Sequence, residues 1–594
     1  MDQLSKWYAL VPIVAAIAIR LFLTDAVGAV ALVVVAVEIL AVCWVVGRGV
    51  LVGVLREPVP DRAMTSASIV VGACVLIIAS NVLLLCRAPS LVQTMVMSAV
   101  VVGAVAVVVR RSSDAGRGWG VEVVPILVAI AASAFPMIVH DAFSVAGNQL
   151  DSLRHQDGAQ HTLLVFASQL GVPRAEAYSL GIHSFLGTFA NVLGLDPFRT
   201  VAAGVPAIAA LVACGAHWLA CSVGLGRRVA IVIGVLVGAH PLLVFVAMEH
   251  YLPQLAACAL VAAACAIAST PNRGRRSQVL LALVLAALLA AYGLAFVIVI
   301  PLVAVVAVRQ GQFRVVAVLQ VLALVIVLAP MGTLRIAERG QIIGEHPERT
   351  FEVSTQPADR SVLFPSSDVI SWNVSLAHVF GFTPFRDHFK FTSRQLEDEA
   401  PAISTALDGW AAAIVPALVL CTLLVVAFSW WRARPTTLAI GTGVVLGLAY
   451  ALFVAEIVRG YHLFKITSLV TVPVVVIVIS ALDVLVVPRW RSLVLGVFIA
   501  CQVPALVAIE ARYAFELALD RDFVAVVEPL RAATRRRNVV LTDTWDTSRV
   551  YWLRNYVLGL ARIGTIGDLV LCSCRECPQL PVLVEDGSYC LLQR

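Results

Sequence analysis

Hydrophobic residues along this chain gather in runs of about 18 to 25 positions, long enough for a helix to cross a hydrocarbon core of about 30 Å. A helix of this kind satisfies its own backbone hydrogen bonds inside the bilayer. The pattern predicts about fifteen membrane helices, over residues 7–24, 26–47, 66–86, 91–109, 119–139, 200–222, 228–247, 252–269, 277–291, 293–308, 314–334, 409–429, 436–457, 464–487 and 492–510.

Two of these apolar regions depart from the pattern of one run for each span. Residues 277–308 form one apolar stretch that is too long for a single crossing at about 1.5 Å per residue, and its interruption at "AAYGLA" predicts two short helices. The N-terminus, "MDQLSKWYALVPIVAAIAIRLFL", lacks a clear small-residue cleavage site and a second run follows at once. We therefore expect a retained first helix instead of a signal peptide.

Basic residues occur in every second connection between the predicted spans. Lys and Arg collect on the cytoplasmic side of membrane proteins, so this alternation predicts a cytoplasmic N-terminus and an extracytoplasmic C-terminus in the plasma (inner) membrane. The long segments 140–199, 335–408 and 511–594 then lie outside the cytoplasm. The basic connections are "GRGVLVGVLREPVPDRA", "RRSSDAGRG", "GRR", "NRGRR", "RQGQFR", "WWRARP" and "PRWR".

Composition agrees with a multi-pass membrane protein. Of the 594 residues 60% are hydrophobic and 13% charged, with a mean hydropathy of +0.93, far above that of a water-soluble globule. The pI of about 8.7 reflects cytoplasmic arginines and implies no nucleic-acid partner. We expect three parts: a four-helix N-terminal extension (1–118), a membrane core (119–510) and an extracytoplasmic cap (511–594).

Titratable residues cluster just beyond the fifth predicted span, in "NQLDSLRHQDGAQHTLLV". Asp151, His155, Asp157 and His161 lie there within eleven positions, on the side where ATP and nucleotide sugars are absent. A solvated loop is the simple alternative. The following "TLLVFASQLGVPRAEAYSLGIHSFLGTFANVLGL" predicts two helices that lie along the membrane surface.

These segments resemble the GT-C superfamily of membrane glycosyltransferases, which take sugars from polyprenyl-phosphate carriers. "DGAQHTLLVFASQLG" followed by "YSLGIH" is similar to the Asp-x-x-x-His and Tyr-Pro-x-Gly-x-His patterns of actinobacterial members. The resemblance is best over residues 120–225 and departs from the pattern at Ser179, where proline is expected. It implies a GT-C-like membrane core and an inverting transferase. The donor would be a polyprenyl-phosphate sugar, and the acceptor a cell-envelope glycan, lipid or protein.

Inverting transfer needs a carboxylate to remove the proton from the acceptor hydroxyl. By resemblance Asp157 is the first candidate, and His161 lies one helical turn later. Asp141, at the end of the fifth span, is the second candidate and Asp151 the third, and Asp151 with His155 would border the substrate cavity. The structural alternative for Asp157 is an N-cap of the helix starting near residue 159.

The phosphate leaving group needs donors or cations to hold its charge. "EIVRGYHLFKITSLV" offers Arg459, Tyr461, His462 and Lys465 at the external mouth between two spans. In relatives an aromatic and then a basic residue contact the lipid phosphate here, which implies that role for Tyr461 and Lys465. Interfacial anchoring is the alternative.

Three further residues are candidates for the cavity or its surroundings. Glu249 and His250 occupy another external turn, in "AMEHYLPQ". His183, in "YSLGIH", more often packs or meets headgroups in such a place than it binds a ligand.

A cofactor is not required by the sequence. His155, Asp157 and His161 offer nitrogen and oxygen ligands, yet the loop lacks a thiolate and a His-Glu-x-x-His motif, which disfavours zinc. A Mg²⁺, Mn²⁺ or Ca²⁺ ion held by Asp157 and Asp141 with donor phosphate is the alternative that remains open.

The tail contains four of the 13 cysteines: Cys572, Cys574, Cys577 and Cys590. Outside the cytoplasm this spacing predicts disulfides, with zinc binding as the alternative. "NVVLTDTWDTSRVYWLRNYVLGL" predicts a strand, a turn and a helix, so we expect a small α/β cap.

Two other functional classes stay open. A lipid or glycan transporter should place its polar residues near the bilayer midplane. An O-antigen-type ligase or polymerase would use Arg and His of the 335–408 loop, where Arg335, Arg339, His346, Arg349, Arg360, His378, Arg386 and His388 lie.

Overall fold

The helical body of the protein follows the predicted spans. The computed structural model describes residues 29–55, 59–111, 121–143, 156–172, 180–195, 197–270, 275–309, 315–330, 332–334, 375–383, 410, 413–429, 436–455, 460–515, 538–541, 562–563, 569–573, 582–586 and 589–593. Each predicted span from 26–47 onward coincides with a described helix, or a pair of helices, to within one or two turns. The predicted span 7–24 lies outside the described residues.

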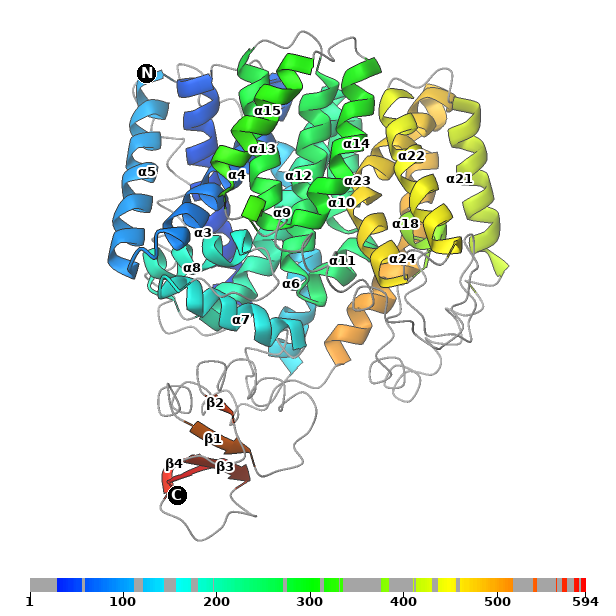
Figure 1. The fold of residues 1–594 in the computed structure, drawn as a ribbon. Coiled ribbons are helices and arrows are strands. Elements are labelled where there is room, and N and C mark those ends of the chain that lie inside the picture. The colour runs from blue at the N-terminus through cyan, green and yellow to red at the C-terminus, as the bar shows by residue number, and fades with distance from the viewer. Residues whose placement is uncertain are drawn as a thin grey trace, which may run out of the picture.

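The helices run mostly side by side in one bundle (Figure 1). They are α3 (Ala29–Arg48), α4 (Met64–Leu85), α5 (Ser90–Arg111), α6 (Val124–Phe143), α7 (Gln156–Gln169), α8 (Gly181–Leu193), α9 (Pro197–Ser222), α10 (Arg227–Gly238), α11 (Pro241–Met248), α12 (Leu252–Ser269), α13 (Arg275–Ala291), α14 (Gly293–Arg309), α15 (Val315–Leu328), α18 (Leu376–Val379), α21 (Val415–Ser429), α22 (Thr436–Val454), α23 (Gly460–Leu485) and α24 (Arg491–Phe515). Within the described residues, eight helices are long and apolar enough to cross a bilayer, or nine with the bent pair α10–α11. The fold is that of an α-helical, multi-pass membrane protein, and the count of about fifteen spans stays a prediction.

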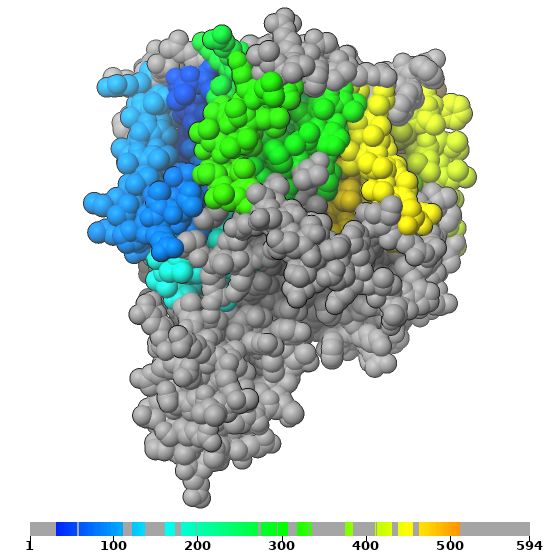
Figure 2. All heavy atoms as spheres, in the orientation of Figure 1, coloured from blue at the N-terminus to red at the C-terminus, as the bar shows by residue number. Residues whose placement is uncertain are grey.

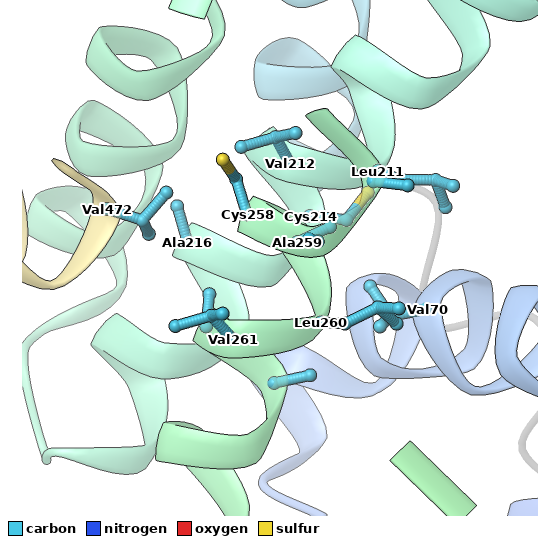
Figure 3. Packing of buried hydrophobic residues seen from close by; sticks show 14 of the residues in the cluster. Val70, Leu211, Val212, Cys214, Ala216, Cys258, Ala259, Leu260, Val261 and Val472 are labelled. Carbon is cyan, nitrogen blue, oxygen red and sulfur yellow. The ribbon is translucent and has the colours of Figure 1, made fainter. Parts of the chain in front are cut away.

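The centre of the bundle is α9, which packs against α12, α10, α6, α3 and α4. The apolar stretch of α9 is wholly buried inside the bundle. Small residues allow this contact, since Val212 and Ala216 of α9 face Cys258 and Ala259 of α12 (Figure 3). In membranes such close packing is one of the contributions that drive helix association.

The outer helices have a different character. In the apolar stretches of α5 and α24, only 17% and 22% of the residues are buried, as expected for helices that face lipid. Figure 2 shows α5 (light blue) at one edge of the molecular surface and α22 (yellow) toward the other.

One predicted span is broken. The sequence predicted a single helix over 228–247, but α10 and α11 meet at 44°. Pro241 is the first residue of α11, where its fixed φ suits a helix start and its missing N–H ends the preceding helix.

The C-terminal region contains a five-stranded sheet in the order β2-β1-β3-β5-β4. β1 is parallel to β2 and β3, whereas β5 is antiparallel to β3 and β4. The register places Cys572 opposite Cys590. The helical part of the predicted cap lies outside the described residues. The strands are β1 (Asn538–Leu541), β2 (Arg562–Ile563), β3 (Leu569–Ser573), β4 (Val582–Asp586) and β5 (Tyr589–Gln593).

Candidate functional site

Helices α7 and α8 are the two surface helices that the sequence predicted. With 14 and 13 residues they reach about 20 Å, too short to cross the hydrocarbon core. Figure 1 shows α7 lying across one end of the bundle, with α8 beside it. Asp157 is in the first turn of α7 and Asp141 is in the last turn of α6. Nothing of their side chains is described, and Asp151 and His155 lie outside the described residues.

A pair of buried histidines joins α7 to α8. His161 Nδ1 and His183 Nε2 lie 2.6 Å apart, and the rings stack with centroids 4.8 Å apart. Their exposed fractions are 2% and 0%. One imidazole nitrogen must donate while the other accepts, so the pair shares one proton at this contact. The sequence favoured packing for His183, and the structure adds a specific polar partner.

The start of α8 packs against the break between α13 and α14. A Cβ atom added at Gly181 would lie 2.6 Å from the carbonyl carbon and oxygen of Ala290, so a glycine is required for this approach. The break itself lies at Tyr292, whose N–H donates to Leu288 O at 2.7 Å. The predicted interruption at "AAYGLA" is therefore a contact point between the surface helices and the bundle.

Lys465 lies near the same break. It lies in the second turn of α23, and its Nζ is 6.0 Å from the centroid of the Tyr292 ring. A cation over an aromatic face at this distance is worth about 0.5–1 kcal/mol at exposed sites. The start of α8 and the Lys465 side chain of α23 thus both contact residues 290–292, and α7 is linked to α8 by the contact of His161 with His183.

Polar contacts from α12 hold this part of α23. Gln254 Nε2 donates to Ser468 Oγ at 2.7 Å, and Ser468 Oγ donates to Lys465 O at 2.9 Å. The Phe464 ring lies 5.9 Å from Phe245 and 6.0 Å from Tyr251, centroid to centroid. These contacts fix the rotation of α23 and hence the direction in which Lys465 leaves the helix.

The turn between α11 and α12 is part of the same neighbourhood. Tyr251, which packs on Phe464 of α23, follows Glu249 and His250, and each of these two is 1% exposed. His250 has φ 56°, a left-handed conformation that is rare for a residue other than glycine and asparagine. The sequence placed Glu249 and His250 at the cavity, and in the structure both are buried beside the α23 contact.

The remaining phosphate-binding candidates are placed only in part. Tyr461 is in the first turn of α23 by its backbone, one turn before Lys465. His462 is exposed, and Arg459 lies outside the described residues. Sequence reasoning missed Tyr292 and Gln254 as members of the site. The break "AAYGLA" and the isolated polar residue in "YLPQLAACAL" were the available signals.

A short piece of the 335–408 loop is buried in the bundle. His240 Nε2 donates to Val379 O at 3.1 Å, Gln502 Nε2 to Phe380 O at 2.9 Å and Trp410 Nε1 to Phe382 O at 3.0 Å. Among the Arg and His candidates of the ligase hypothesis, His378 is the one within the described residues, and its Nδ1 accepts from Ser375 N as a helix cap. Its observed contact is structural.

A second polar cluster lies where α4, α6, α9 and α10 begin or end. Arg227 Nη2 lies 3.9 Å from Glu122 Oε1, and Ser66 Oγ lies 3.0 Å from His217 Nδ1. Glu122 precedes α6, on a short 3-10 helix. Burial raises the pKa of Glu122 from 4.5 to about 7, although Thr65 and Arg227 counteract part of that rise. The charge alternation predicts that this cluster faces the cytoplasm.

Metal binding finds no support in the described part of the chain, where no group of three or more His, Cys, Asp and Glu residues is arranged to hold an ion. The divalent ion that the sequence left open at Asp157 and Asp141 would depend on side chains outside that part.

Comparison with known proteins gives no family assignment. No protein-family model and no curated protein matches the chain. Among solved structures, the oligosaccharyltransferase of Archaeoglobus fulgidus, tethered with an acceptor peptide containing the NVT sequon, aligns with a TM-score of 0.43 and 10% identity over 74% of this chain. The alignment spans 63% of that enzyme, less than two thirds of its length. ArnT from Cupriavidus metallidurans in the apo state aligns with a TM-score of 0.41 and 13% identity, over 79% of this chain and 97% of that one.

Proposed function

We propose that the chain is an inverting membrane glycosyltransferase of the GT-C type, which moves a sugar from a polyprenyl-phosphate donor to a cell-envelope glycan, lipid or protein acceptor on the outer face of the membrane. The observation that carries the proposal is the convergence at residues 290–292. The helix that bears Asp157 and His161 is joined there, through His183 and α8, to the helix that bears Lys465. A general base and a phosphate site must lie close together to act in one reaction, and this chain of contacts supports that arrangement.

In the proposed reaction Asp157 is the general base. Its carboxylate takes the proton of the acceptor hydroxyl while the hydroxyl oxygen forms a bond to the anomeric carbon. The bond from that carbon to the phosphate oxygen breaks, and its electron pair leaves with the polyprenyl phosphate. Loss of the proton from Asp157 to water restores the carboxylate.

Lys465 has the second role in this proposal, because charge develops on the phosphate as the sugar departs. A cation held in place by its own helix stabilises such charge without reorganising at the moment of reaction. Hydrogen bonds from Gln254 to Ser468 and from Ser468 to the Lys465 carbonyl supply that rigidity. Tyr461 is four residues earlier on α23, and positions i and i+4 share a face of a helix.

The histidine pair has a supporting role. His161 is one turn after Asp157, so its contact with His183 fixes the orientation of the first turns of α7 relative to α8. A misplacement of the base by about 1 Å lowers the rate about a hundredfold. A contact that holds α7 in place against α8 would therefore support the reaction.

The donor class is testable directly. Purified protein in lipid nanodiscs would be incubated with radiolabelled polyprenyl-phosphate pentoses and hexoses and, in parallel, with the corresponding nucleotide sugars. We expect sugar release or transfer from lipid-phosphate donors alone, and a product of inverted anomeric configuration by NMR. Use of nucleotide sugars, or a retained configuration, would contradict the proposal.

A further inference from the structure

A glutamine from the N-terminal extension contacts both surface helices of the proposed site. Gln93 lies in the first turns of α5 and is 1% exposed. Its Nε2 donates to Ala88 O at 2.9 Å and to Ser168 O of α7 at 3.0 Å. Its Oε1 accepts from Asn191 Nδ2 of α8 at 3.0 Å.

The amide of Gln93 is fully used by this arrangement. Thr188 Oγ1 lies 3.4 Å from the same Oε1, so both donor hydrogens and both acceptor sites of the amide have partners. Rotating the amide by half a turn would place its oxygen against two carbonyl oxygens, so the network defines its orientation.

The partners of Gln93 also bind one another. Asn191 Nδ2 donates to Gln169 O at 3.1 Å, and Gln169 Nε2 donates to Leu195 O at 3.2 Å. The carboxyl ends of α7 and α8 are therefore joined in one network, and Gln93 connects that network to α5. The histidine pair joins the same two helices nearer their amino ends.

Close packing surrounds the network. Gly171, at φ +67°, lies so near the α4–α5 turn that an added Cβ would be 2.5 Å from Ala88 O. Leu84 of α4, Leu164 of α7 and Leu180, next to α8, form one buried apolar cluster.

The rest of α5 shows that Gln93 is not a solvent-facing polar residue. Leu91 and Met95, its neighbours on the opposite side, are 66% and 63% exposed, as expected of a face turned to lipid. A polar side chain in an apolar helix is costly unless it is hydrogen-bonded, so its inward position needs the partners it has.

We propose that Gln93 is a positioning residue for the transfer reaction, and that the N-terminal extension serves to hold α7 and α8 at the separation in which His161 meets His183 and Asp157 faces the acceptor. The inference rests on the proposed function for its catalytic consequence. Its structural part, the immobilisation of α7 and α8 by Gln93, does not depend on that function.

The test uses the full-length protein in nanodiscs with Gln93→Leu, which keeps the approximate size and removes the amide. The matched control is Gln320→Leu on α15, where the glutamine is exposed. We expect Gln93→Leu to lower kcat for release of sugar from polyprenyl-phosphate donors by about ten- to a hundredfold, with little change in KM for the donor. Hydrogen exchange should rise in α7 and α8 and stay unchanged in α9 and α12.

A double-mutant cycle separates positioning from general destabilisation. If Gln93 acts through Asn191, adding Asn191→Leu to Gln93→Leu should lower kcat by less than the product of the single effects. The inference fails if exchange in α7 and α8 is unchanged, if kcat matches that of Gln320→Leu, or if the loss only follows the amount of folded protein. Near-normal transfer by Asp157→Asn would instead overturn the proposed function. The two failures are distinguishable because hydrogen exchange is measured without substrate and does not depend on the reaction.

Discussion

Lys465 offers a quantitative test of the phosphate site. The residue is half-buried, its Nζ lies 6.0 Å from the Tyr292 ring centroid, and its carbonyl accepts a hydrogen bond from Ser468 Oγ. A hydrogen bond between charged groups contributes about 1.5–3 kcal/mol. Because every 1.4 kcal/mol is about tenfold in Kd, removing the ammonium should weaken binding of a polyprenyl phosphate by about ten- to a hundredfold.

The perturbation is Lys465→Met, which keeps most of the length of the unbranched side chain and removes its charge. Lys465→Arg is the conservative comparison and should lose far less, since the guanidinium still pairs with phosphate. Arg275→Met, at an exposed position that starts α13, controls for loss of net charge. Binding would be measured by microscale thermophoresis in nanodiscs, against a sugar-free polyprenyl phosphate.

The salt dependence of binding gives a second readout. The wild-type Kd should rise with ionic strength, because salt screens a half-exposed charge pair, and the Lys465→Met protein should show a smaller rise. Equal Kd values for wild type and Lys465→Met would refute the role assigned to Lys465.

Three further predictions concern other parts of the chain. Burial raises the folded-state pKa of Glu122 to about 7, so the contribution of Glu122 to stability is complete below about pH 4.5 and is lost as the pH rises through 7. The melting temperature should therefore fall more between pH 5 and 8 for wild type than for Glu122→Gln. Equal falls for the two proteins would contradict this prediction. Cys572 lies opposite Cys590 in the register, and opposite strand residues have the Cα spacing of a disulfide. Non-reducing peptide mapping should therefore find that bond as one of the two disulfides expected in the tail. Four free thiols or bound zinc would contradict the prediction. Reporter fusions after residues 117 and 276 should report the cytoplasm, and fusions after 359 and 594 the exterior; a cytoplasmic C-terminus would contradict the topology.

Much of the helical architecture was predictable from the sequence because the bilayer imposes length and apolarity on every span. The break at Tyr292 followed from the same argument, since residues 277–308 are too long for one crossing. The bend before Pro241 was missed, because that run has the length and hydropathy of a single span and proline alone does not define an angle.

The long-range contacts of the site were beyond sequence reasoning. Nothing in the pattern brings Lys465 to Tyr292, because their contact depends on how α23 packs against helices distant in the sequence. Gln93 had no visible role for the same reason, as its partners on α7 and α8 lie 75 to 98 positions away. By contrast, the i, i+4 spacing of Asp157 and His161 is local and was readable once a helix was expected.

Asp157 is proposed as the general base of an inverting transfer. The most direct measurement is the single-turnover rate of transfer from a polyprenyl-phosphate sugar by Asp157→Asn, which keeps size and most hydrogen bonding but cannot accept the proton, with Asp141→Asn as the matched comparison. We expect Asp157→Asn to lose about 10² to 10⁴ fold in rate with donor binding intact, and Asp141→Asn to lose less. Near-normal transfer by Asp157→Asn would contradict this role.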